Sequence, residues 1–235
     1  MARRAALPND APPPSGDPMP TLRQACMLGL SCLAMTTASH AEEFGGVEFP
    51  QGASSFADAV KSFDPVIKSG QPTAPFLIAS RALGVPDYDG GNGGYPSLGD
   101  GGSITVEFVD NRLTGSGDNK LDLWIFEIGP DVEDTFIEIS QNGVTWSSVG
   151  KVLGSTRGVD IDAFGFGRGD LFRFVRLTDD GDLDGQTGNT VGADIDAVGA
   201  ISSIVAPPAI PEPETYALML AGLVAVAAAA RRRRR

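Results

Sequence analysis

Cysteine and histidine are almost absent from this 235-residue chain. The two cysteines, Cys26 and Cys32, and the single histidine, His40, all lie near the N-terminus. The sequence beyond them therefore excludes disulfides, cysteine nucleophiles, Ser-His-Asp triads and histidine-ligated zinc. A domain without these devices must rely on its own apolar core, and this chain is long enough to bury one.

Basic residues are also scarce. Residues 42–210 hold 26 Asp and Glu but only 10 Lys and Arg. The basic residues are scattered and form no stripe that could follow a row of phosphates, so nucleic-acid binding is disfavoured. Many of the acids are aspartates set among glycines, a composition that suits Ca²⁺ because this ion takes oxygen ligands on flexible turns.

Long apolar runs are also absent. The first of two short apolar runs lies near the N-terminus. Residues 22–41 combine the basic Arg23, an apolar stretch, and small residues at Ser39 and Ala41. This layout predicts a secretory signal peptide that signal peptidase cleaves after Ala41. The preceding residues 1–18 are proline-rich and predicted to be disordered, so Met19 is an alternative start. Residues 1–41 are thus an extension plus a signal peptide.

The second apolar run, residues 216–230, lies close to the C-terminus. It is shorter than the ~20 residues of an ordinary spanning helix, a deficit that snorkelling arginines and a thinned bilayer offset. Five cations end the chain: Arg231, Arg232, Arg233, Arg234 and Arg235. They predict a cytoplasmic end, a single transmembrane helix at 216–230 and a domain outside the cytoplasm.

A short motif precedes this helix: Pro211, Glu212 and Pro213. The order Pro-Glu-Pro, apolar helix, arginine cluster over residues 211–235 resembles the PEP-CTERM sorting signal of Gram-negative bacteria; a plain tail anchor is the alternative. The resemblance implies a membrane-anchored precursor and an exosortase that removes the anchor near the motif. It further implies delivery to the cell surface or extracellular matrix, in systems that make exopolysaccharide and biofilm.

The middle of the chain reads as short strands divided by Gly- and Asp-rich turns. Residues 121–128 (LDLWIFEI) are apolar on both faces and predict a central strand. Asn142-Gly143 predicts a hairpin. The strands are expected at 103–109, 121–128, 135–140, 144–149, 171–178 and 195–201. This pattern predicts an all-β, antiparallel, jelly-roll-like β-sandwich at residues 42–202, followed by a linker at 203–210.

A second resemblance covers residues 81–202. The segments SLGDGGSITVEF and GADIDAVGAI are its most specific pieces. These two segments and the other predicted strands follow one another along the chain in an order that resembles bacterial cell-surface β-sandwich domains. Those domains are related to the discoidin and galactose-binding jelly rolls. The resemblance implies a binding domain, often for glycans and often with a structural Ca²⁺.

The segment DDGDLDG at residues 179–185 is the candidate metal loop. Its alternate aspartates are Asp180, Asp182 and Asp184, spaced as in the first half of an EF-hand loop. The twelfth position is Val191 rather than Glu, which excludes an EF-hand. Asp194 or Asp196 would complete the coordination. We predict a structural Ca²⁺ here, with a solvated acidic turn as the alternative.

Aromatic residues offer sites for stacking on a sugar. Tyr88 and Tyr95 lie in a glycine-rich loop and are expected to be exposed glycan-binding residues. Trp124 and Trp146 fall inside strand patterns and are expected in the core.

Paired carboxylates are the enzymatic alternative, a glycoside hydrolase or lyase. The candidates are Asp87, Asp89, Asp118, Asp122 and Glu127. Hydrolysis needs two carboxylates about 5–10 Å apart across a sugar ring, and sequence spacing does not give that distance. No catalytic residue is therefore assigned. The sequence favours an exported, non-enzymatic surface or matrix protein that either binds a glycan such as exopolysaccharide or is a structural component of a biofilm.

Overall fold

The computed structural model describes residues 40–90, 94–128, 133–153, 157–181 and 188–206, together with 219, 221–224 and 230–232. The predicted signal peptide upstream of residue 40, the Pro-Glu-Pro motif, and Asp182 and Asp184 lie outside the described residues. The described residues of the C-terminal segment are helical and exposed. Within the described residues no helix has the length and apolarity to cross a membrane.

The described domain is built from twelve short strands joined by turns and loops. The first are β1 (Glu42–Phe44), β2 (Val47–Phe49) and β3 (Ala59–Asp64). They are followed by β4 (Ser103–Glu107), β5 (Asn111–Leu113), β6 (Leu123–Glu127), β7 (Asp134–Ser140) and β8 (Ser147–Leu153). The last are β9 (Arg157–Val159), β10 (Phe174–Asp179), β11 (Ile195–Ala200) and β12 (Ser203–Val205). Short 3₁₀ turns η1 (Gly52–Ser55), η2 (Ala74–Phe76), η3 (Ala79–Ala82) and η4 (Asp162–Phe164) lie between them.

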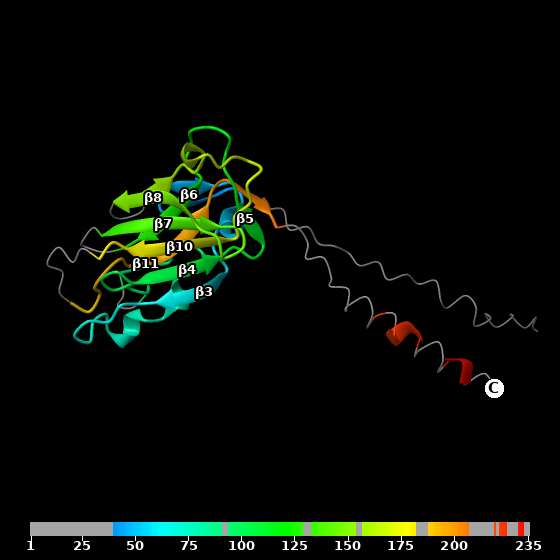
Figure 1. The fold of residues 1–235 in the computed structure, drawn as a ribbon, viewed down its shortest axis with the longest axis horizontal. Coiled ribbons are helices and arrows are strands. Elements are labelled where there is room, and N and C mark those ends of the chain that lie inside the picture. Colours follow the sequence, from blue (N-terminus) through cyan, green and yellow to red (C-terminus); the bar gives the residue numbers. More distant parts are fainter. Residues whose placement is uncertain are drawn as a thin grey trace, which may run out of the picture. The chain divides into compact units, whose positions relative to one another are not determined.

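These strands form two main antiparallel sheets. One has the order β3-β4-β10-β7-β8 and the other the order β11-β6-β9. Figure 1 shows the five strands of the larger sheet side by side in this order. Two further pairs, β1–β2 and β5–β12, flank them.

The core lies between the two sheets. From the larger sheet, the fully buried Ile104 of β4 and Leu177 of β10 join one apolar cluster. Leu123 and Ile125 of β6 and Val198 of β11 join the same cluster from the smaller sheet. Two sheets that share one apolar layer form a β-sandwich. The predicted fold class is therefore confirmed.

Both faces of strand β6 are covered, which explains why its sequence is apolar on both sides. Leu123 and Ile125 point into the sandwich, whereas Trp124 and Phe126 point to the outer face. The outer face is covered by the β1–β2 hairpin and η1, whose Phe49 and neighbouring Phe56 pack against it. The prediction of a central strand at this position is confirmed, because β6 lies between β11 and β9.

The hairpin predicted around Asn142-Gly143 joins β7 to β8 through a longer loop than expected. Strand β8 begins at Ser147 rather than Val144. The side-chain Oδ1 of Asn142 accepts the N–H of Val144 at 2.8 Å, and Gly143 takes a φ of +73°. The asparagine side chain therefore closes the turn itself, and the strand pairing starts only after it.

The predicted linker begins too early in the sequence. Residues 203–205 form β12, which pairs with β5, and the N–H of Ala206 donates to the carbonyl of Asp110 at 2.7 Å. The sandwich therefore extends to residue 206. Backbone pairing with β5 holds this short strand in the fold, although the side chains of Ile204 and Val205 are exposed.

Gly199 of β11 lets the rings of Phe49 and Phe56 pack directly against the strand. A Cβ placed on Gly199 would lie 2.7 Å from Cε1 of Phe49 and 2.9 Å from Cε1 of Phe56. We expect Gly199→Ala to lower the free energy of unfolding by about 1–3 kcal/mol, because both buried rings must shift. Urea unfolding measures this. Gly169→Ala is the matched control, because no atom lies within 4 Å of its added Cβ; equal midpoints for the two variants would contradict the packing argument.

Candidate functional site

A groove of about 590 Å³ opens on the outer side of the smaller sheet, beside the start of β6. Its apolar lining comes from Pro50, Leu121, Trp124 and Ile201. Its polar lining comes mainly from Asp118, Asn119, Lys120 and Arg168. We call this the Trp124 groove. An apolar floor with a few polar groups around it is typical of a small-molecule or glycan site.

The indole of Trp124 is held in place by packing rather than by a hydrogen bond from its N–H group. Trp124 is opposite Gly158 of β9 in the sheet, and a Cβ on Gly158 would lie 2.8 Å from Cε2 of the indole. The ring therefore lies close against the glycine backbone. Its Nε1–H has no acceptor among the described residues. Trp124 is half-buried and lines the groove, so the expectation of a purely core role holds only in part.

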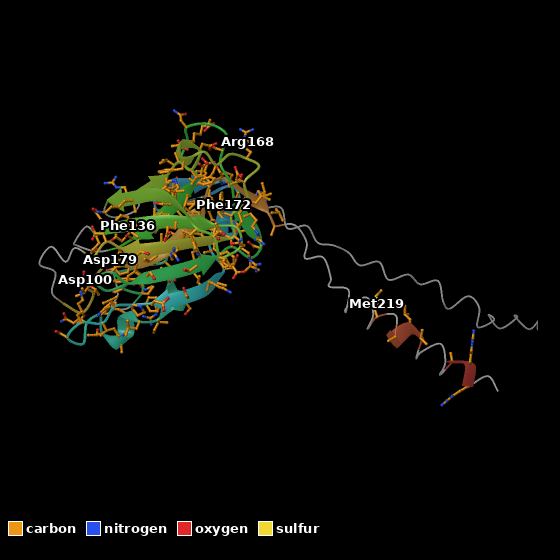
Figure 2. The ribbon with its side chains drawn as sticks, in the orientation of Figure 1. Asp100, Phe136, Arg168, Phe172, Asp179 and Met219 are labelled. Atoms are coloured by element: carbon orange, nitrogen blue, oxygen red, sulfur yellow. The ribbon has the colours of Figure 1, made fainter. Side chains whose placement is uncertain are left out.

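The rim is set by the loop that precedes β6. Nε of Arg168 donates to the carbonyl of Ser116, and a Cβ on Gly117 would lie 2.8 Å from that same Nε. The guanidinium is therefore fixed against the loop. Lys120 and Asp118 form an exposed ion pair at 3.1 Å. Figure 2 shows Arg168 at one end of the domain, far from Asp179.

A buried carboxylate ties this loop to the rest of the site. Asp122 is fully buried; its Oδ1 accepts the N–H of Ser116 at 2.8 Å and its Oδ2 accepts the N–H of Ile161 at 2.9 Å. Burial raises the pKa of Asp122, while these hydrogen bonds act in the opposite direction. The carboxylate thus joins the loop before β6 to the turn after β9.

Asp122, Asp160 and Asp162 bring one oxygen each within 4.8 Å of one another. Oxygens of all three accept hydrogen bonds from the surrounding loops: Asp162 from the N–H of Gly117 at 3.1 Å, and Asp160 from the N–H of Ala163 at 3.3 Å. These hydrogen bonds tie the surrounding loops to the three carboxylates.

The predicted glycan-binding tyrosines have different exposures. Tyr88 is 39% exposed, but Tyr95 is only 8% exposed. The expectation of an exposed ring is therefore wrong for Tyr95, which packs edge-on against Tyr88 at 5.3 Å and against Phe76 at 5.5 Å. Burial, with Asp194 nearby, raises the pKa of Tyr95 to about 12.

The predicted Ca²⁺ ligands are divided between two environments. Asp180 forms an ion pair with Lys151 at 2.8 Å. Asp194 and Asp196 are instead buried at the start of β11. Burial raises the pKa of Asp194 to about 8 and that of Asp196 to about 6.

Two glutamates that were not predicted as metal ligands lie near these buried aspartates. Glu127 ends β6 and Glu133 precedes β7, and both are buried. Burial raises the pKa of Glu127 to about 9, and the carboxylates of Glu133 and Asp194 push it in the same direction. We call Glu127, Glu133, Asp194 and Asp196 the acidic cluster. Sequence separation conceals it, because β6 and β11 are paired only in the folded sheet.

Three of the acids considered for catalysis, Asp118, Asp122 and Glu127, do not share one cleft. Asp118 lines the Trp124 groove, Asp122 is buried behind it, and Glu127 lies at the other end of β6. In the groove, Asp118 is the single carboxylate among the described lining residues.

Comparisons with known proteins agree with the sorting signal. Residues 209–235 match the PEP-CTERM protein-sorting motif, which confirms the predicted signal. The motif marks an exported protein that is sorted to the cell surface, with an exosortase as its processing partner. No match is found among the curated proteins.

Two solved structures are similar to part of the chain. One is CpGH89CBM32-6 from Clostridium perfringens, with 15% identity, a TM-score of 0.31, and coverage of 45% of this chain and 72% of that one. The other is the C-terminal domain of a chitobiase from Bacteroides fragilis, with 15% identity, a TM-score of 0.37, and coverage of 66% of this chain and 97% of that one.

Proposed function

We propose that the sandwich is a non-enzymatic glycan-binding domain that holds a sugar in the Trp124 groove. The observation that carries this proposal is the position of Trp124, half-buried against Gly158 and lining the groove. A sugar ring offers an apolar C–H face, which an indole packs against, while its hydroxyl groups need hydrogen-bonding partners around it. Lys120, Arg168 and Asn119 supply donors at the rim.

The polar groups of the groove favour binding over hydrolysis. Glycoside hydrolases commonly use two carboxylates on opposite sides of the scissile bond. Asp118 supplies one, and both oxygens of the nearby Asp122 already accept backbone N–H groups. The groove can therefore orient a sugar, but its described residues do not offer an acid and a base together.

The sorting motif suggests where the glycan comes from. A domain released at the cell surface by an exosortase would first meet the exopolysaccharide of its own cell. We propose that polymer as the ligand and a role in the matrix or biofilm as its consequence.

The test is a binding screen with the full chain in mild detergent. Immobilised polysaccharides, including exopolysaccharide from the source bacterium, are incubated with the protein or with buffer alone, and bound protein is measured. Each polysaccharide that binds is then titrated by calorimetry. We expect saturable binding to that exopolysaccharide or a component sugar, without release of reducing ends. Failure to bind any glycan would overturn the proposal, and release of reducing ends would support the enzymatic alternative.

A further inference from the structure

The Trp124 groove holds a cation that has no carboxylate partner among the described residues. Two cations, Lys120 and Arg168, are among the residues that line the groove. Lys120 pairs with Asp118 at 3.1 Å, whereas none of the ion pairs between described residues includes Arg168. The hydrogen bond that Arg168 makes runs from Nε to the carbonyl of Ser116. Its two terminal amino groups, Nη1 and Nη2, therefore remain available to a ligand.

Four other arginines use their terminal amino groups within the domain. Arg173 and Arg176 form ion pairs with glutamates through Nη2. Arg81 and Arg112 donate from Nη1 to backbone carbonyls. Arg168 differs from these four, because its contact with the protein is made through Nε and leaves the end of the guanidinium open. The difference coincides with its place in the groove.

The backbone around Arg168 holds the guanidinium in place. A Cβ on Gly117, which has a φ of +77°, would lie 2.8 Å from Nε and 3.3 Å from Cζ of Arg168. The guanidinium therefore packs directly on the glycine, next to the carbonyl of Ser116 that accepts its Nε–H. The N–H of Gly115 donates to the carbonyl of Gly167 at 3.3 Å, which joins the two loops beside the arginine. A side chain held in this way loses little conformational freedom when a ligand binds.

The acids near this rim are engaged with the loop. Asp118 pairs with Lys120, and Asp162 accepts the N–H of Gly117 at 3.1 Å and the hydroxyl of Ser116 at 3.2 Å. The described lining of the groove thus carries one anion and two cations. Residues 42–210 as a whole hold 26 acids and 10 bases. An anionic group is therefore repelled less at this groove than over the rest of so acidic a domain.

We propose that the groove selects an acidic sugar, whose ring packs on Trp124 and whose carboxylate pairs with Nη1 and Nη2 of Arg168. The inference rests on the glycan-binding function proposed above and names the class of sugar. A planar guanidinium offers two parallel N–H groups that match the two oxygens of a carboxylate. A neutral sugar offers these donors only hydroxyl groups, which form weaker hydrogen bonds than a charged acceptor.

Removal of the carboxylate from the ligand tests the sugar class. Exopolysaccharide from the source bacterium is compared with the same polymer after its carboxylates have been reduced to primary alcohols. Calorimetry with the full chain in mild detergent is expected to show an affinity about five- to tenfold lower for the reduced polymer. Equal affinity for the two polymers would overturn the inference and leave the glycan proposal standing. Failure to bind any glycan would overturn the proposed function itself.

A substitution of the arginine tests which residue reads the carboxylate. Arg168→Gln should lose the same five- to tenfold in affinity for the native polymer and nothing for the reduced polymer, because the two changes remove the same interaction. Arg81→Gln is the matched control: Arg81 lies outside the lining of the groove and donates to the carbonyl of Pro75. It should bind both polymers as the unmodified protein does. An equal loss of Arg168→Gln on both polymers would overturn the pairing with a carboxylate.

Two further measurements separate carboxylate recognition from attraction by charge alone. Arg168→Lys keeps the positive charge but not the paired donors, so it should recover only part of the lost affinity. Dextran sulfate, an anionic polymer without carboxylates, should bind the unmodified protein no better than it binds Arg168→Gln. Full recovery by lysine, or binding of dextran sulfate that depends on Arg168, would show that the groove reads charge alone and would overturn the inference.

Discussion

Trp124→Ala is expected to weaken glycan binding by at least about thirtyfold, equivalent to ~2 kcal/mol. The indole provides the largest flat apolar surface in the groove, and alanine leaves only the glycine backbone of β9 beneath the sugar. Aromatic anchors of this kind dominate binding energies because they bury much surface with little loss of conformational freedom. Calorimetry with the best glycan from the screen measures the change.

Trp146→Ala is the control, because it removes the other tryptophan at a different place. Trp146 precedes β8, and the guanidinium of Arg176 lies 4.3 Å from its ring centroid. We expect its glycan affinity to match that of the unmodified protein. Both variants are assayed below their melting temperatures, since Trp124 also packs against the aromatic cluster. Unchanged affinity of Trp124→Ala would show that the groove is not the glycan site.

The sequence predicts six strands, which correspond to β4, β6, β7, β8, β10 and β11, because their local patterns reflect burial. It does not predict β1, β2, β5, β9 and β12, because three residues are too few to show such a pattern. Alternation in β4 places Ile104 and Val106 in the core, and the doubly apolar β6 proves to be covered on both faces. Strand boundaries are less certain. The asparagine side chain delays β8, and backbone pairing adds β12 beyond the predicted end of the domain. Neither the turn closed by the asparagine side chain nor the backbone pairing of β12 changes the alternation of apolar residues from which strands are predicted.

The sites were harder to predict because each joins residues that are distant in sequence. The sequence around Trp124 predicts a core residue. That Gly158 of β9 lies opposite it is known only from the folded sheet, because the two residues are far apart in the sequence. Likewise, Asp194 and Asp196 could be singled out from their segment alone. Their association with Glu127 depends on the pairing of β11 with β6, which includes a register shift between Ile195 and Ala197.

The shape of the groove also depends on a residue that does not line it. Asp122 holds the N–H of Ser116, and the carbonyl of Ser116 holds Arg168 at the rim. The backbone carbonyl of Asp122 accepts the N–H of Ile201, which also lines the groove. One buried aspartate therefore connects several residues that line the groove, and binding should be sensitive to it without any contact with the sugar.

Asp122→Ala is accordingly expected to lower the free energy of unfolding by about 3–5 kcal/mol. It leaves the N–H groups of Ser116 and Ile161 without their acceptor, at about 1–3 kcal/mol for each buried donor. Urea unfolding followed by tryptophan fluorescence measures the loss. Asp160→Ala is the matched control from the same cluster, since Asp160 is less buried and accepts the N–H of Ala163 at 3.3 Å; we expect it to cost under about 1 kcal/mol. Equal losses in the two variants would mean that the loop is held by other contacts, and the rim of the groove would then not depend on Asp122.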